Sequence, residues 1–182
     1  MVPFFVEANP RCQVMIPRIN ALAGALRAAG GTVAWVLPSG NDPHPELSDE
    51  FHGAAIADVY RRSGGDGPLP RRLCPGLVHG ADDLFVEKTG VSAFFPGRCG
   101  LPDMLAARGI RTLIVAGTVT NVCCESTVRD ARGLGYRVIM LADVNAAGSD
   151  AMHNATLLTV YRSFGDVRTT GEVLDLIAGA AP

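Results

Sequence analysis

The sequence predicts an α/β fold, in which a mostly parallel sheet carries helices on both faces. Short apolar runs rich in β-branched residues recur along the chain, and such runs are typical of strands buried on both faces of a parallel sheet. Segments with helical periodicity lie between these runs, and this alternation belongs to α/β proteins. The 182 residues are enough for a substantial core, so we expect residues 1–182 to form a single domain.

The composition narrows the classes of protein to which the chain can belong. Its hydrophobic content of 48% and charged content of 19% are those of a compact globular protein. A net charge of −2 provides no basic surface for nucleic acid or an anionic membrane, and no apolar run approaches the ~20 residues that span a bilayer. Five cysteines without regular spacing argue against a disulfide framework, so we expect a cytoplasmic protein.

The first part of the chain is expected to be irregular up to Gln13 and then to form a helix and a strand. The helix is expected to begin near Ile16, with Pro17 suited to its first turn, and to end at Gly30. The apolar run Thr32–Leu37 follows as a buried strand.

Residues 39–83 are the least regular part of the sequence and are rich in proline and glycine. Within them, the spacing of apolar residues predicts one helix, Asp49–Arg62. An insertion of this length in a compact domain is usually functional, often as a lid or a subunit contact. Because the histidines of this segment lack metal-ligand spacing, we expect surface or structural roles for His44, His52 and His79.

The remaining elements alternate between strands and helices. In order, the patterns predict a strand at Leu84–Lys88, a helix at Leu101–Ala107, a strand at Thr112–Ala116, a helix over Val122–Arg132, a strand at Arg137–Ala142, a helix at Met152–Phe164, a short strand at Val167–Arg168 and a last helix that ends near Ala178. Thr169 and Glu172 form a capping-box sequence before the last helix. His153 lies in the first turn of its helix, where we expect a cap or a solvent-exposed side chain rather than a catalytic base.

The candidate nucleophile is one of two adjacent cysteines after the strand Thr112–Ala116. Gly117 ends that strand, and Cys123 and Cys124 follow in the first turn of the next helix. Unpaired backbone N–H groups and the positive end of the helix dipole favour a thiolate there, and the same groups can hold an oxyanion. Neighbouring helical residues point about 100° apart, so at most one of the two faces a site. The alternative is that both are small core residues.

A lysine at the end of another strand is the candidate partner of the thiol. Lys88 ends the strand Leu84–Lys88, and ligands of open parallel sheets bind at the carboxyl ends of strands. A nearby ammonium stabilises a thiolate and can carry a proton, whereas the alternative is a solvated residue at the rim. Phe94 and Phe95 lie on the loop that follows, where a pocket wall and a core position fit the sequence equally well.

Two motifs resemble those of the isochorismatase-like cysteine hydrolases. The run Gly117–Thr127, with residues 129–131 behind it, resembles the nucleophile motif of that family. Val86–Lys88, followed by Ser92–Phe94, resembles its lysine motif. Val138–Asp143 and the last helices also fit, so the resemblance covers almost the whole chain. It implies the fold of these hydrolases, a three-layer α/β sandwich.

The resemblance also implies roles for individual residues. Cys123 takes the place of the nucleophile and Lys88 that of the family's lysine, whereas Cys124 lies where the family often has a valine. A cis peptide bond is implied between Val119 and Thr120. In the family this bond turns two backbone N–H groups, here those of Thr120 and Cys123, toward the oxyanion.

One part of the family's pattern is missing from the sequence. The family's third catalytic residue is an aspartate at the end of the first strand, in an Asp-x-Gln motif, and this chain has neither that strand nor that motif. The strand lies in the middle of the family's sheet, so its absence removes ladder hydrogen bonds and buried apolar area. We expect either a shortened sequence, which is the favoured interpretation, or an impaired member with weak or absent hydrolysis.

The activity implied by the resemblance is hydrolysis of a C–N bond in a small amide, ureido or carbamoyl compound through a thioester on Cys123. The motif is closest to that of ureidoacrylate-type amidohydrolases. No metal or cofactor is implied, and Phe94, Phe95 and Asn121 are expected to line the pocket. The alternatives are a vinyl-ether hydrolase acting on isochorismate, which need not use the cysteine, and a non-catalytic ligand-binding member. Family members are typically dimers or tetramers, so we expect a homodimer or a homotetramer.

Overall fold

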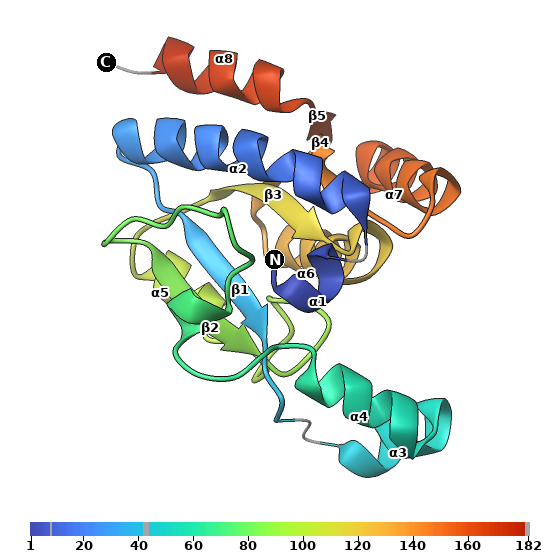
Figure 1. Ribbon diagram of the computed structural model, residues 1–182. Helices are drawn as coiled ribbons and strands as arrows, with labels where there is room; N and C mark the ends of the chain where they lie inside the picture. Colours follow the sequence, from blue (N-terminus) through green and yellow to red (C-terminus); the bar gives the residue numbers. More distant parts are fainter. Residues whose placement is uncertain (8, 42–43, 181–182) are drawn as a thin grey trace.

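The computed structural model describes residues 1–7, 9–41 and 44–180 (Figure 1). The strands are β1 Ala34–Pro38, β2 Leu84–Lys88, β3 Thr112–Thr118, β4 Arg137–Ala146 and β5 Asp166–Arg168. The α-helices are α1 Pro3–Val6, α2 Pro10–Ala28, α3 Pro45–His52, α4 Ala54–Arg62, α5 Leu101–Ala106, α6 Glu125–Gly133, α7 Asp150–Ser163 and α8 Thr170–Ala180. Two short segments complete the elements, the 3-10 turn η1 Leu69–Arg72 and the π-helical turn η2 Thr120–Cys124.

The paired strands all run parallel, as the sequence predicts. β1 pairs with β2 from Ala34 opposite Leu84 to Pro38 opposite Lys88. β3, β4 and β5 are neighbours in that order, and the register between β3 and β4 shifts after Val115.

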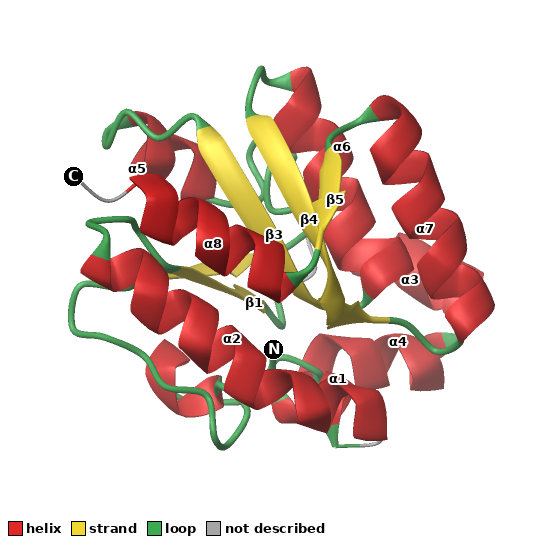
Figure 2. Cartoon of the chain, turned by 90° about the horizontal axis from the view of Figure 1, so that it is seen from above, coloured by secondary structure: helices red, strands yellow, loops and turns green. Residues whose placement is uncertain are grey.

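Helices cover both faces of the strands, which confirms the α/β class. Figure 2 shows α2 and α8 on one face and α6 and α7 on the other. The core beneath α2 and α8 includes Met15, Leu22, Leu141, Val144 and Val173. The core beneath α5, α6 and α7 includes Leu105, Val128, Met140 and Val160. The strands therefore form the middle of three layers.

The strands do not form one continuous sheet. In the part of the chain that the structure describes, β1 and β2 form one sheet and β3, β4 and β5 another, with no ladder between β1 and β3. The predicted burial of Thr112–Ala116 on both faces is therefore wrong. Thr112 and Ala116 are exposed, and the three residues between them are only half-buried. The physical reason is that, among the described strands, β3 pairs only on its β4 side.

The amino-terminal segment is helical, so the expected irregular start is wrong. Asn9 caps α2 by accepting a hydrogen bond from the Arg11 N–H, and Pro10 occupies its first turn. Both residue types suit these positions. Pro17 lies inside α2 rather than at its start.

The described residues of 39–83 form two α-helices where one was predicted. Gly53 separates α3 from α4, and its φ of 78° lies in a region that other residues rarely adopt. Figure 1 shows this helix pair away from the strands. The pair leaves large apolar side chains exposed, with Phe51 at 78%, Ile56 at 54% and Tyr60 at 53%.

The remaining elements agree closely with the sequence patterns. β2 covers the predicted residues, and β4 continues four residues beyond Ala142, to Ala146. The capping box is confirmed, because Glu172 accepts from the Thr169 N–H at 2.8 Å and donates its own N–H to Thr169 at 3.3 Å. None of the described helices is long and apolar enough to cross a membrane.

Candidate active site

The candidate nucleophile lies on a backbone segment of unusual geometry. β3 ends at Thr118, and η2 begins two residues later, so Cys123 lies on a π-helical turn rather than in the first turn of α6. Such turns are rare and occur often at functional sites. A cis peptide bond joins Thr118 to Val119. The position expected for it, between Val119 and Thr120, is therefore wrong by one residue.

Lys88 contacts the sulfur of Cys123. Its Nζ donates to Cys123 Sγ at 3.4 Å, to the Gly90 carbonyl at 2.9 Å and to the Val91 carbonyl. An ammonium has three N–H donors, so each has an acceptor. The Lys88 side chain is buried, with 8% exposure, and these contacts hold it in one place. The structure thus brings the two predicted residues together at the carboxyl ends of β2 and β3.

No acidic side chain pairs with this buried ammonium among the described residues. The hydrogen-bond acceptors of the Lys88 ammonium are two carbonyl oxygens and the sulfur of Cys123. The sulfur of Cys123 is therefore the group in contact with Lys88 that can carry a compensating negative charge.

Cys124 faces the interior. It is 5% exposed and belongs to the core beneath α5, α6 and α7. Burial raises the pKa of its thiol to about 12, which leaves the neutral form at pH 7. Cys123 is half-buried, and both cysteines line the cavity described next, so the expectation that at most one of them faces a site stays a prediction.

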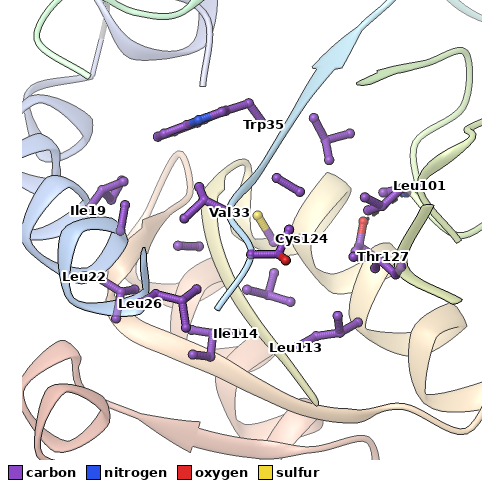
Figure 3. Close-up of a pocket in the computed structure, with 18 of the residues that line it drawn as sticks. Ile19, Leu22, Leu26, Val33, Trp35, Leu101, Leu113, Ile114, Cys124 and Thr127 are labelled. Carbon is purple, nitrogen blue, oxygen red and sulfur yellow. Dashed lines mark hydrogen bonds between the residues drawn. The ribbon is translucent and has the colours of Figure 1, made fainter. Parts of the chain in front are cut away.

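A cavity of about 370 Å³ extends from Cys123 and Lys88 between the two sheets. Figure 3 shows side chains of α2, β1 and β3 around it, together with Cys124 and Thr127. The labelled apolar residues are Ile19, Leu22, Leu26, Val33, Trp35, Leu101, Leu113 and Ile114. Thr118 also lines the cavity, and its buried Oγ1 has no hydrogen-bond partner within the described ranges. The cavity is therefore apolar along the strands and polar at the cysteine.

The α-amino group of Met1 is buried near the same centre. Burial lowers the pKa of this amino group from its usual value. The nearby thiols of Cys124, Cys74 and Cys123 oppose that shift but do not cancel it. The Met1 carbonyl accepts from the Cys74 N–H at 3.0 Å.

The three residues predicted to line a pocket lie in different surroundings. Phe94 is 2% exposed, packs edge-on against Tyr136 and lines the cavity between the sheets. Phe95 is 54% exposed and lines a second hollow of about 460 Å³ with Arg98 and Arg129. Asn121 is half-buried, and its Oδ1 has no hydrogen-bond partner in the part of the chain that is described.

His153 is the polar side chain near the site that sequence analysis missed. Its ring contacts Thr120 Oγ1 through Nδ1 and the Ala142 carbonyl through Nε2, both at 3.0 Å. The expected cap or solvent-exposed position is therefore wrong. The sequence carried no signal for these contacts, because residues 120 and 153 lie 33 positions apart and meet only when α7 packs on η2.

No group of three His, Cys, Asp or Glu residues is arranged to hold a metal ion within the ranges that the structure describes. The candidate site presents a half-buried thiol beside a buried ammonium. Together, fold and site define an α/β protein with a lysine–cysteine pair at the carboxyl ends of parallel strands.

The chain belongs to the isochorismatase family, since the family model "Isochorismatase domain" matches residues 1–172. A ureidoacrylate amidohydrolase, RutB, from Agrobacterium fabrum is 42% identical over 179 residues, which cover 92% of this chain and 78% of the relative. An uncharacterized isochorismatase family protein, YwoC, from Bacillus subtilis is 30% identical, with 90% of this chain and 83% of the relative covered.

Solved structures agree with this assignment. A cysteine hydrolase from Pseudomonas syringae pv. phaseolicola superposes with a TM-score of 0.82 at 31% identity, covering 99% of this chain and 90% of that one. N-carbamoylsarcosine amidase from Thermoplasma acidophilum shares the fold, with a TM-score of 0.72 at 22% identity over 93% of this chain and 92% of that one.

Proposed function

We propose that this chain is a cysteine-dependent amidohydrolase that cleaves a C–N bond of a small amide, ureido or carbamoyl compound. The observation that carries the proposal is the contact of 3.4 Å between the Lys88 ammonium and Cys123 Sγ at the polar end of a cavity. An ammonium fixed against a sulfur stabilises the thiolate, which is the nucleophilic form. The RutB relatives are ureidoacrylate amidohydrolases, which supports the substrate class.

In the first half of the reaction, Cys123 Sγ attacks the substrate carbonyl carbon and the π bond electrons move to oxygen. Backbone N–H groups of Thr120 and Cys123 are proposed to hold that oxyanion. The tetrahedral intermediate collapses, the C–N bond breaks, and Lys88 gives a proton to the leaving nitrogen. The acyl group remains on sulfur as a thioester.

In the second half, water attacks the thioester carbonyl and loses a proton to Lys88. The C–S bond then breaks, which releases the acid and restores the thiolate and the ammonium. Phe94, Phe95 and Asn121 are proposed as pocket residues; Phe94 lines the cavity and Phe95 the neighbouring hollow. The proposed reaction requires no metal or cofactor.

The proposal is tested by a screen of small amides and ureides, read by ammonia release. We expect Cys123→Ala to abolish release, whereas Cys124→Ala retains it with a lower melting temperature. Activity of Cys123→Ala on isochorismate would instead favour the vinyl-ether reaction, which does not need the sulfur. A Cys123 that fails to react with iodoacetamide at neutral pH would favour a ligand-binding protein.

We also propose a homodimer or homotetramer with residues 39–83 at a contact, and a cytoplasmic location. The exposed apolar side chains of α3 and α4 support the contact, because such groups are covered in many assemblies. The five unpaired cysteines support a reducing compartment. Light scattering, which measures the mass of the assembly, tests the proposed homodimer or homotetramer. Residues 1–182 are also proposed to fold as one domain.

A further inference from the structure

His153 connects three parts of the structure that are distant in sequence. It lies on α7, its Nε2 meets the carbonyl of Ala142 in β4, and its Nδ1 meets Thr120 Oγ1 at the start of η2. Thr120 is three residues before Cys123 on the same π-helical turn. A single imidazole therefore joins the sheet and α7 to the turn that carries the sulfur.

The chemistry of the two contacts fixes the proton positions of a neutral ring. A carbonyl oxygen only accepts hydrogen bonds, so the Ala142 contact places the ring proton on Nε2. Nδ1 is then an acceptor, and the Thr120 hydroxyl donates to it. The hydroxyl hydrogen therefore points at His153, and its direction is no longer free.

Thr120 is a buried residue of the turn. Its hydroxyl oxygen contacts His153 Nδ1 at 3.0 Å and is therefore engaged by the imidazole. The hydroxyl anchors the first residue of the turn, whose carbonyl accepts from the Glu125 N–H at the other end of η2. A buried hydroxyl that lost its acceptor would need a new one, and the turn would shift to provide it.

We propose that His153 is a positioning residue for Cys123: by holding the Thr120 hydroxyl, it fixes the turn that places the sulfur against Lys88. The inference rests on the proposed function of Cys123 as the nucleophile. It assigns His153 no contact with substrate. Misplacement of a reacting group by about 1 Å costs about 100-fold in rate, so such an anchor matters for catalysis.

A second link between α7 and the segment after η2 makes the test specific. Thr156 of α7 donates to Glu125 at 2.6 Å, and Glu125 also accepts from Arg129. α7 therefore remains attached to α6 when the His153 bond is lost, so a variant of His153 changes the turn without detaching the helix.

Substitution of His153 by either of two amide residues tests its two hydrogen bonds separately. His153→Asn offers Oδ1 near the place of Nδ1 and keeps an acceptor for Thr120, whereas His153→Gln offers its NH₂ near the place of Nε2 and keeps the donor to Ala142. We expect the rate of Cys123 alkylation by iodoacetamide, located by tandem mass spectrometry, to fall about 10-fold or more in His153→Gln and less than 3-fold in His153→Asn. His52→Gln, an exposed site on α3, serves as the matched control.

Thr120 provides the reciprocal test. Thr120→Ser keeps the hydroxyl and is expected to lose clearly less reactivity than Thr120→Val, which is expected to match His153→Gln. In the double variant of Thr120→Val and His153→Gln, the two losses should not add, because both remove the same bond. Equal rates for His153→Asn and His153→Gln, or parental reactivity of Thr120→Val, overturn the proposal.

Two further readouts separate this proposal from the proposed function. Nitrogen NMR of the labelled ring should show a proton on Nε2 and none on Nδ1, and Thr120→Val should shift the Nδ1 signal. The opposite tautomer overturns the positioning role. Where the chain turns over an amide, the loss in His153→Gln should lie in kcat with KM little changed. Alkylation and NMR need no substrate, so failure to find an amide substrate leaves this test intact.

Discussion

Lys88 is the only lysine in the sequence, and arginine fills the other fifteen of the sixteen Lys and Arg positions. Arginine presents a wide planar fork, whereas an ammonium is a compact point charge with three donors. The ammonium of Lys88 donates to two carbonyl oxygens and one sulfur, and the residue is only 8% exposed. A guanidinium does not fit that set of acceptors.

Replacement of Lys88 should therefore lower the reactivity of the neighbouring sulfur of Cys123. In Lys88→Met, the aliphatic stem remains but the positive charge is lost, so the sulfur of Cys123 loses the neighbouring charge that favours ionisation of a thiol. We expect alkylation of Cys123 at neutral pH to slow at least about 10-fold, and amide turnover to fall with it. Lys88→Arg keeps the charge but not the fit and should give an intermediate rate. Unchanged alkylation in Lys88→Met would show that the ammonium does not activate the sulfur.

At the scale of elements, Asp83 joins α2, β1 and the loop before β2. Burial opposes its ionisation, but hydrogen bonds from Arg27, the Gly80 N–H and Trp35 Nε1 outweigh it and hold the pKa of the carboxyl at about 2. Because the folded pKa lies below that of an unfolded aspartate, the carboxylate stabilises the fold at neutral pH. This contribution is lost as the pH falls from about 4 through 2.

Asp83→Asn should reveal that contribution. At pH 7 we expect the free energy of unfolding to drop by about 2 kcal/mol, which corresponds to the lowered pKa. The difference from the parent chain should shrink toward zero as the pH approaches 2, and urea unfolding at several pH values measures it. A difference that does not depend on pH would mean that packing rather than charge accounts for the loss.

Some helices and strands could be predicted from the sequence, and others could not. β2, β5 and α7 were located because an apolar run or stripe marks them locally. The start of α2 was not, because Pro17 signals a first turn but lies inside the helix, while Asn9 and Pro10 form the real start. At the site, Lys88 and Cys123 were predicted from strand ends, where parallel topology brings side chains together.

Other parts of the site depend on packing between distant segments and had no local signal. The contact of His153 with Thr120 depends on where α7 lies on η2. The position of the cis bond, at Thr118–Val119, depends on the backbone between β3 and η2. Neither is set by the identity of adjacent residues alone.

For the whole molecule, the cavity between the two sheets affects how much the side chains of each strand contribute to stability. Leu141 of β4 is fully buried, whereas Ile114 of β3 is half-buried and lines the cavity. Truncation to alanine removes the same number of carbons from either, but Ile114 already faces open space. We expect Leu141→Ala to cost about 3 kcal/mol and Ile114→Ala about 1 kcal/mol.

Urea unfolding of the two variants checks this ranking. Equal losses would mean that the cavity closes in solution and that Ile114 is packed on all sides. A third variant, Val160→Ala in the core beneath α7, tests a fully buried position on the other face and should also lose more than Ile114→Ala.

The interruption of the sheet has a consequence for cooperativity. Because no rung of the ladder links β1 to β3 within the described residues, the pair β1–β2 can separate from the rest without breaking a bond of the β3–β4–β5 unit. Subglobal opening then occurs at a lower free energy than global unfolding. Deuterium should therefore enter the amides of residues 34–37 and 84–88 well before those of residues 138–141, and the molecule should behave as two foldons that meet near the sulfur of Cys123.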